Sequence, residues 1–190
     1  MKKVMVLGSF VVDLMGRSPH LPERGETVKS SFFKMGPGGK GFNQAVAAKR
    51  AGADVDVVIK IGCDEFASVA LDCMEQEGMD KGLVRQTGEV PTGAALIMVD
   101  EQTGDNMISV YLGASNSYSD EDIEFLKPYI EGCSYLLMQL EINMDAVKKI
   151  AAFAKSKGVR VLLNPAPAAE VEEELLNGLF AVVPNEVEAR

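Results

Sequence analysis

A glycine-rich segment contains the residues best suited to binding a hydroxylated ligand. Gly36-Pro37-Gly38-Gly39-Lys40-Gly41-Phe42-Asn43 leads into an alanine-rich pattern typical of a helix. Consecutive glycines let a backbone approach a ligand closely, and the N–H groups at a helix N-terminus point toward such a ligand. Asn43 falls in the first turn, where its amide can hydrogen-bond a hydroxyl. A tight turn that merely precedes a helix is the alternative interpretation.

Other polar residues follow apolar runs. Asp13 comes shortly after the run 3–8, Glu141 ends the run 135–140, and Asn164 ends a later one. Ligands of open α/β sheets bind at the carboxyl ends of strands, and carboxylates there can accept hydrogen bonds from polyol hydroxyls. The alternatives are a solvated loop residue for Asp13 and a cap of the following helix for Glu141.

Asn185 and Glu188 form a second polar pair, after the apolar run 180–183 and Pro184. At this spacing both residues fall on one face at the start of a helix. They can order phosphate oxygens and the water bound to magnesium, an ion that needs few carboxylates because it keeps several waters. Helix capping is the alternative interpretation of this pair.

Two familiar nucleotide-binding motifs do not fit the glycine-rich segment. A dinucleotide-binding loop directly follows the first strand, whereas about 28 irregular residues separate Gly8 from Gly36 here. A Walker A loop requires Ser or Thr after its lysine, and Gly41 stands at that position. The segment therefore indicates close backbone approach to a ligand without naming a nucleotide.

Hydrophobic periodicity predicts alternating strands and helices around these residues. Strands are expected at 3–8, 55–61, 134–140, 159–164 and 179–183, and helices at 41–51, 64–78, 119–130, 144–157 and 170–176. This alternation favours a three-layer αβα, Rossmann-like α/β fold with a parallel sheet. The segments 9–36 and 91–112 are strand-like without helices, and we expect them to pair as a small separate sheet.

Composition excludes several classes of protein. The length of 190 residues suits one domain, and the net charge of −9 argues against a nucleic-acid partner. No apolar run approaches the roughly 20 residues that span a bilayer. Cys63, Cys73 and Cys133 are odd in number and form no CxxC, which predicts reduced cytoplasmic thiols without a zinc site. Any Ser-His-Asp hydrolase would depend on the only histidine, His20.

Taken together, these segments resemble the ribokinase, or phosphofructokinase-B, family of sugar kinases. The matching blocks are GSFVVD at 8–13, PERGETV at 22–28, GGKGFNQAVAAKRAGA at 38–53, TGAALI at 92–97, LLMQLE at 136–141, LNPAPA at 163–168 and PNEVEA at 184–189. They occur in family order along the whole chain. The resemblance implies a ribokinase-like fold whose segments 9–36 and 91–112 form a β-lid over the sugar, which often also makes a homodimer contact.

The resemblance also implies roles for the polar residues. Those implied to bind the sugar are Asp13, Gly38, Gly39, Lys40, Asn43 and Glu141. Asn185 and Glu188 would lie near the ATP phosphates, with Glu188 on the magnesium side. The implied reaction transfers the γ-phosphoryl group of ATP to a primary sugar hydroxyl, which requires positioning, charge neutralisation and a base.

Two departures from the family pattern qualify these expectations. Val11 stands where ribokinases have an asparagine that contacts ribose, which argues against ribose and favours a related furanose or pentose. The family's anion-hole loop, catalytic aspartate and monovalent-cation site lie beyond the block at 184–189. We therefore expect residues 1–190 to be a C-terminally incomplete α/β domain, from a longer kinase or an early-terminated product, that is inactive alone.

Three other functions remain as alternatives. A non-catalytic sugar-binding or regulatory module would retain the lid and the sugar site. A nucleoside kinase of the same superfamily would share the fold, and competition between ribose and adenosine would distinguish it. A nicotinamide-dependent oxidoreductase is the third alternative, and NAD binding tests it.

Overall fold

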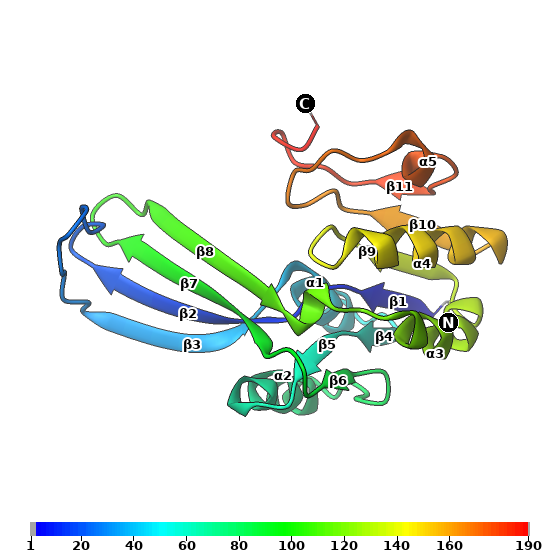
Figure 1. Ribbon diagram of the computed structural model, residues 1–190, viewed down its shortest axis with the longest axis horizontal. Coiled ribbons are helices and arrows are strands. Elements are labelled where there is room, and N and C mark those ends of the chain that lie inside the picture. Colours follow the sequence, from blue (N-terminus) through cyan, green and yellow to red (C-terminus); the bar gives the residue numbers. More distant parts are fainter. Residues whose placement is uncertain (1–2, 190) are drawn as a thin grey trace.

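The computed structural model describes residues 3–189 as an α/β body with a projecting β-sheet (Figure 1). The body is built on a five-stranded sheet in the order β11-β10-β9-β1-β4. All neighbouring strands in it are parallel. The strands are β1 (Val4–Leu7), β4 (Val55–Val58), β9 (Tyr135–Met138), β10 (Arg160–Leu163) and β11 (Ala181–Val182). The predicted parallel sheet is confirmed.

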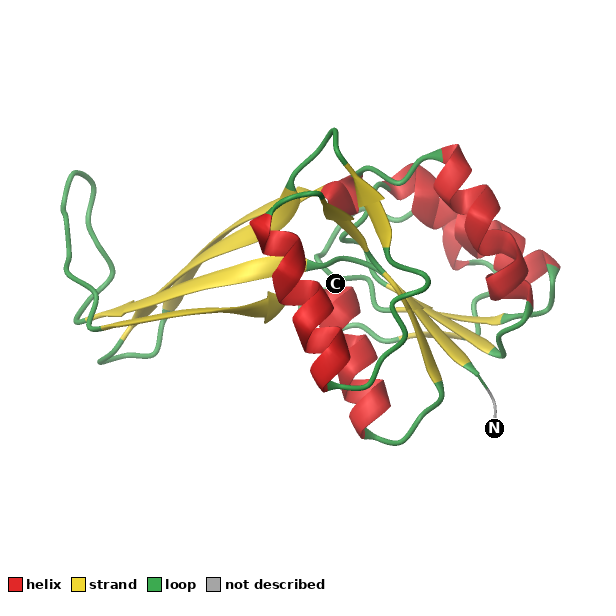
Figure 2. Cartoon of the chain, turned by 90° about the horizontal axis from the view of Figure 1, so that it is seen from below, coloured by secondary structure: helices red, strands yellow, loops and turns green. Residues whose placement is uncertain are grey.

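Helices cover both faces of this sheet (Figure 2). Met5 of β1 packs into a core with α3 (Asp120–Glu131) and α4 (Met144–Ser156). Its neighbour Val6 packs on the opposite face, against α1 (Lys40–Arg50) and α2 (Glu65–Gln76). Because successive side chains of a strand point to opposite faces, this division confirms the three-layer αβα arrangement. A short helix, α5 (Glu173–Leu176), packs against α4.

The second sheet projects from the body and is called the lid below (Figure 1). Its order is β3-β2-β7-β8, from β2 (Val11–Ser18), β3 (Phe32–Gly38), β7 (Thr92–Asp100) and β8 (Asn106–Gly113). Strand β2 pairs parallel to β7, and the outer pairs are antiparallel. The prediction that two helix-free segments distant in sequence pair as a small sheet is therefore confirmed.

Two predicted boundaries are wrong. Gly36, Pro37 and Gly38 belong to strand β3 and pair with β2, so the glycine-rich segment begins as strand and not as loop. Pro37 is tolerated because β3 is an edge strand, where a missing N–H breaks no ladder. The apolar run 55–61 is also two strands, since β5 (Lys60–Gly62) leaves the body sheet to pair with β6 (Arg85–Thr87). Both pieces are buried, so periodicity does not mark the break.

A buried ion cluster joins β5 and β6 to the start of α3. The side chain of Asp122 accepts hydrogen bonds from Lys60 Nζ at 2.6 Å, Arg85 Nε at 2.7 Å and the backbone N–H of Ser119 at 3.0 Å. Burial alone raises the pKa of Asp122, but the bonds from Lys60, Ser119 and Arg85 outweigh it and lower that pKa to about 2. Ser119 and Asp122 also cap α3 reciprocally, each side chain accepting a hydrogen bond from the backbone N–H of the other residue.

Among the described helices, none combines the length and the apolar composition needed to cross a bilayer.

Replacing Asp122 should expose the dependence of the body on this cluster. Asp122→Ala is expected to lower the free energy of unfolding by about 3–5 kcal/mol, because the buried Lys60 loses its counter-ion. Urea denaturation at neutral pH measures the loss. The difference from wild type should narrow in acid, because a lowered folded-state pKa means stability that is present above pH 3.8 and lost as the pH falls toward 2.

Asp120→Ala is the matched control, since Asp120 lies in the same helical turn but pairs with Lys149 at the surface. Its expected cost is below about 1 kcal/mol. Equal decreases in the free energy of unfolding of the two variants would contradict a special role for the buried cluster.

Candidate functional site

The N-terminus of α1 packs tightly against the turn that joins β1 to β2. The backbone N–H of Phe42 donates to the carbonyl oxygen of Ser9 at 3.0 Å. Gly39 precedes the helix with a φ of 91°, a left-handed conformation that favours glycine. A Cβ at Gly39 would lie 2.7 Å from the Ser9 carbonyl oxygen. Glycine is thus required for this contact, which places the next residue, Lys40, at the carboxyl edge of the sheet.

Glu141 holds this helix N-terminus from the strand side. Its Oε2 accepts hydrogen bonds from Ser9 Oγ at 2.6 Å and from the backbone N–H of Lys40 at 2.8 Å, and its Oε1 lies 3.3 Å from Lys40 Nζ. A carboxylate at this place is stabilised by the free N–H groups and the dipole of α1. Glu141 therefore caps α1, whereas the following helix α4 begins at Met144 and has Asn143 as its N-cap residue.

Asp13 lies at the base of the lid, on β2. It pairs with Gly36 across the sheet, and a Cβ at Gly38 would lie 2.2 Å from Asp13 Oδ1. Burial and, secondly, the negative charge of Glu141 raise the pKa of Asp13. No hydrogen-bond donor of residues 3–189 reaches its carboxylate. Asp13, Glu141 and Lys40 therefore present two groups of acceptors and one donor cation suited to sugar hydroxyls.

Asn185 and Glu188 meet Lys40 at a neighbouring hollow. Asn185 Oδ1 accepts from the backbone N–H groups of Val187 and Glu188, and Glu188 accepts from the backbone and side-chain nitrogens of Asn185. This is the arrangement of a helix cap, but it also directs Glu188 into a hollow of about 430 Å³. The hollow is lined by Lys40, Asn164, Ala166, Val183, Pro184, Asn185 and Glu188.

Asn43 is the predicted site residue that the structure places apart from this group. It is exposed on α1 and lines a separate hollow with Pro37, Phe42 and Arg50, among others. Its contact with a sugar stays a prediction.

Sequence reasoning missed three polar residues of the site. Ser9 is fully buried and donates to Glu141, while Gln139 is buried and bonded to Gln44 of α1. Gln139 carried a signal, because it interrupts the apolar run that leads to Glu141. Ser9 and Gln44 carried no such signal, since their roles depend on partners distant in the sequence.

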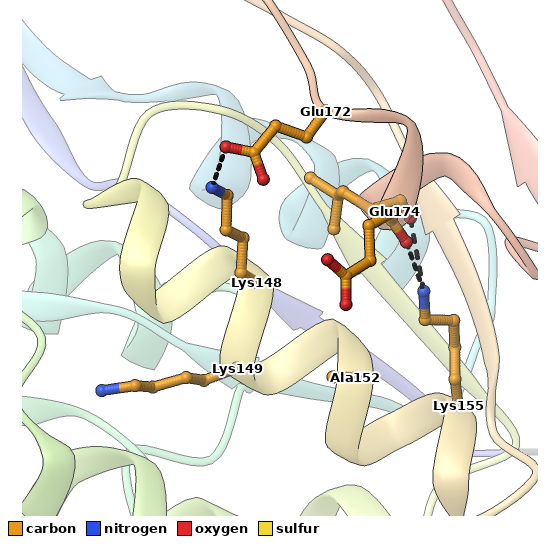
Figure 3. A pocket seen from close by; sticks show the side chains of 7 residues that line it. Lys148, Lys149, Ala152, Lys155, Glu172 and Glu174 are labelled. Atoms are coloured by element: carbon orange, nitrogen blue, oxygen red, sulfur yellow. Dashed lines mark hydrogen bonds and ion pairs between the residues drawn. The ribbon is translucent and has the colours of Figure 1, made fainter.

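Another hollow, of about 270 Å³, lies between α4 and α5 and is rich in lysine (Figure 3). Lys148 Nζ pairs with Glu172 at 2.6 Å, and Lys155 Nζ donates to the carbonyl oxygen of Asn177 at 2.8 Å and also toward that of Glu174 at 3.3 Å. These contacts hold α5 against α4. Lys148 is paired with a carboxylate and Lys155 is bonded to backbone carbonyl oxygens, so we assign the hollow a structural role.

A parallel sheet covered by helices on both faces, together with a projecting β-lid that carries Asp13, defines the class of ribokinase-like α/β folds. Within that class, the chain belongs to the pfkB family of carbohydrate kinases, whose sequence model matches residues 1–190. The resemblance found in the sequence blocks is confirmed.

Curated relatives agree with this assignment. The chain is 40% identical over its full length to a bifunctional ribokinase/ribose-5-phosphate isomerase A of Fructilactobacillus sanfranciscensis, of which it covers 35%. It is 37% identical to a ribokinase of Haemophilus influenzae, across 99% of this chain and 61% of that protein. It is 36% identical to a deoxyribokinase of Salmonella typhi, across 97% of this chain and 60% of that protein. The chain thus spans about 60% of the length of these ribokinase and deoxyribokinase relatives.

The fold is that of solved ribokinases. The structure of Arabidopsis thaliana ribokinase complexed with ribose and ATP aligns with a TM-score of 0.85 and 27% identity. The alignment covers 98% of this chain and 61% of that one. The ribokinase-like parallel sheet with a small β-lid is therefore confirmed.

Asp13→Asn is expected to weaken sugar binding and to stabilise the ligand-free protein at neutral pH. A raised folded-state pKa means that the stability contributed by Asp13 is lost as the pH rises through that pKa, so a neutral amide removes a penalty. We expect the unfolding midpoint to rise by about 2 °C at pH 7. The gain should vanish below pH 3.8, where Asp13 is protonated in both states.

Thermal unfolding and sugar calorimetry measure the two effects. Asp105→Asn, at the exposed turn between β7 and β8, is the matched control and should change neither quantity. A destabilised Asp13→Asn variant would show that the carboxylate has a structural role.

Proposed function

We propose that the longer protein to which this chain corresponds transfers the γ-phosphoryl group of ATP to a primary hydroxyl of a sugar, and that this chain supplies the sugar site and the lid. The position of Lys40 is the observation that supports this most directly. Its Nζ lies 3.3 Å from Glu141, and Lys40 also lines the hollow that contains Glu188. A single cation thus adjoins both the hydroxyl acceptors and the proposed phosphate site.

The proposal divides the chemistry between this chain and the rest of the protein. Residues 1–190 act as one α/β domain with the lid inserted, and the catalytic base, most adenine contacts and any monovalent-cation site are supplied from outside them. The chain spans about 60% of its ribokinase relatives, which is consistent with such a division. The three cysteines are free, which suits the reducing cytoplasm where we place the reaction.

Each residue of the site has a role in positioning the reactants. Asp13 and Glu141, with the backbone at Gly38 and Gly39, orient the sugar, because phosphoryl transfer depends on alignment more than on covalent chemistry. Lys40 offsets the negative charge of the phosphates. Asn43 is proposed to contact the sugar as well.

Magnesium is the ion that this donor set fits. Within residues 3–189 no group of three or more His, Cys, Asp or Glu side chains could enclose a metal. Magnesium needs only one or two carboxylates, because waters and the nucleotide phosphates complete its coordination. Glu188, supported by Asn185, would hold the ion through water, and the bound ion would supply charge neutralisation.

A pentose is the proposed substrate. Val11 is 4% exposed and lies two residues before Asp13 on β2, so both side chains lie on one face of the lid. An apolar side chain beside Asp13 offers no partner to a sugar hydroxyl, so a sugar lacking one hydroxyl is tolerated there. A ribokinase and a deoxyribokinase are both among the relatives, and 2-deoxyribose is accordingly proposed beside ribose.

Coupled ATP assays over ribose, 2-deoxyribose, hexoses and adenosine test the function. We expect turnover of a pentose by the longer protein, and sugar binding without turnover by the 190-residue chain. Glu188→Gln should lower kcat about 100-fold through lost charge neutralisation. Glu186→Gln, an exposed neighbour, is the matched control and should change kcat less than about twofold.

Each outcome of that assay distinguishes between the hypotheses. Turnover by the 190-residue chain alone would contradict the placement of the base outside it. A preference for adenosine would favour a nucleoside kinase, and sugar binding without turnover by the longer protein would favour a regulatory module.

A homodimer through the lid is the second part of the proposal. One face of the lid is rich in exposed apolar side chains: Phe33, Met35, Leu96, Met98, Met107 and Tyr111. Asp13 lies on the opposite face, because the register places these residues at alternating positions. An apolar patch of this kind marks an interaction surface, and a second lid with the same face would cover it.

Leu96→Glu is expected to convert the dimer to a monomer, because it places a charge in the apolar contact. Sedimentation measures the oligomeric state. Ile108→Glu is the matched control, since Ile108 is 56% exposed against 57% for Leu96 but lies on the opposite face of the lid. Equal dissociation in both variants, or a monomeric wild-type protein, would contradict this interface.

A further inference from the structure

A chain of side-chain amides crosses the carboxyl edge of the body sheet between the two parts of the site. Gln139 Nε2 donates to Gln44 Oε1 at 2.5 Å, and Gln44 Nε2 donates to Asn164 Oδ1 at 3.0 Å. Asn164 Nδ2 then donates to the carbonyl oxygen of Val183 at 2.9 Å and toward Glu188 Oε2 at 3.4 Å. This row of hydrogen-bonded amides joins the end of β9, helix α1 and the end of β10 to the carboxylate of Glu188, which is proposed to lie on the magnesium side.

The acceptors at one end determine the orientation of every amide. The carbonyl oxygen of Val183 and the carboxylate of Glu188 can only accept, so Asn164 must present its NH₂ group to them. The oxygen of Asn164 then faces Gln44, which must donate to it, and the oxygen of Gln44 must accept from Gln139. The orientation is therefore transmitted from Glu188 to Gln139, whose own Oε1 is buried without a partner among the described residues.

Helix α1 connects this row of amides to the sugar side of the site. Gln44 lies four residues after Lys40, so the two side chains lie one above the other on the same face of α1. Lys40 contacts Glu141 on the sugar side, and Gln44 contacts Asn164 on the phosphate side. A displacement of α1 therefore changes both contacts together.

Asn164 makes the contact that fixes Glu188 relative to the body. The other bonds to the Glu188 carboxylate come from the backbone and side chain of Asn185, within its own turn. Within residues 3–189, Asn164 is the donor to this carboxylate that belongs to the body sheet region and not to that turn. Without it, Glu188 and its turn can move as a unit relative to Lys40.

We propose that Gln44 is a positioning residue, which acts through Asn164 to hold the carboxylate of Glu188 and so links the sugar side of the site to the magnesium–ATP side. This inference rests on the proposed function for its kinetic meaning. The hydrogen bonds from Gln44 to Asn164 and from Asn164 to Glu188 are properties of the folded chain and are tested separately.

Side-chain amide NMR of the 190-residue chain tests the contact without any assumption about activity. Gln44→Glu replaces the donor to Asn164 with an acceptor, so the side-chain amide signals of Asn164 and Asn185 should shift. Gln76→Glu makes the same chemical change at an exposed position of α2 and should leave both signals unchanged. Gln44→Met, of similar length but without the amide, serves where Gln44→Glu does not fold. Unchanged Asn164 and Asn185 signals in the folded variant would overturn the proposal.

Steady-state kinetics of the longer protein test the consequence. Gln44→Met should raise the magnesium concentration for half-maximal activity about fivefold while the sugar KM changes less than about twofold. A purely structural defect would lower kcat and leave the magnesium dependence unchanged. Asn164→Ala should raise the same concentration, and adding Gln44→Met to it should have no further effect, because Gln44 acts through Asn164.

The opposite results are equally decisive. Fully additive effects of the two substitutions, or a raised sugar KM with an unchanged magnesium dependence, would overturn the positioning role. A wild-type protein that phosphorylates no sugar would refute the proposed function, and the NMR comparison would then decide the contact alone.

Discussion

The packing of the α1 N-terminus against the β1–β2 turn is the constraint on which the rest of the site depends. Gly39 precedes the helix and has no side chain to cap it, so the cap comes from Glu141 at the end of β9. The same carboxylate binds Ser9 after β1. One acid thus fixes two strand ends and one helix start, and these are the elements that carry the hydroxyl acceptors and Lys40. The structural role of Glu141 and its proposed role toward a sugar follow from the same position.

The lid is attached at the same place. Phe10 lies between Ser9 and the first residue of β2, and its ring packs edge-on against Phe42 of α1 with centroids 5.1 Å apart. Ser115, just after β8, accepts a hydrogen bond from the Phe10 N–H at 3.0 Å and donates one to the Phe10 carbonyl oxygen at 2.9 Å. The strand that enters the lid is therefore tied to the segment that leaves it. This attachment holds Asp13 near Glu141 while the distal part of the lid projects into solvent (Figure 1).

The features predictable from the sequence are those that depend on local periodicity. Alternating apolar runs identify the three layers, and the absence of helix in 9–36 and 91–112 identifies the lid. The break between β4 and β5, after Val58, cannot be recognised in the sequence, because both strands are buried. The contacts of Ser9 and Gln44 are not visible either, because their partners lie far away in the sequence. Motif positions therefore indicate the candidate site residues, and only tertiary packing shows what connects them.

Two of the buried polar side chains of the body, Asp122 and Gln139, contrast in a way that bears on function. Asp122 is satisfied by Lys60, Arg85 and the start of α3, as expected of a group retained for stability. Gln139 is equally buried but its Oε1 has no partner among residues 3–189, which costs about 1–3 kcal/mol where no other donor reaches it. A leucine or methionine would pack at the end of β9 without that cost, so packing alone does not account for the amide. We infer that the amide is needed for its bond to Gln44, which maintains the orientation of the amides that lead to Glu188.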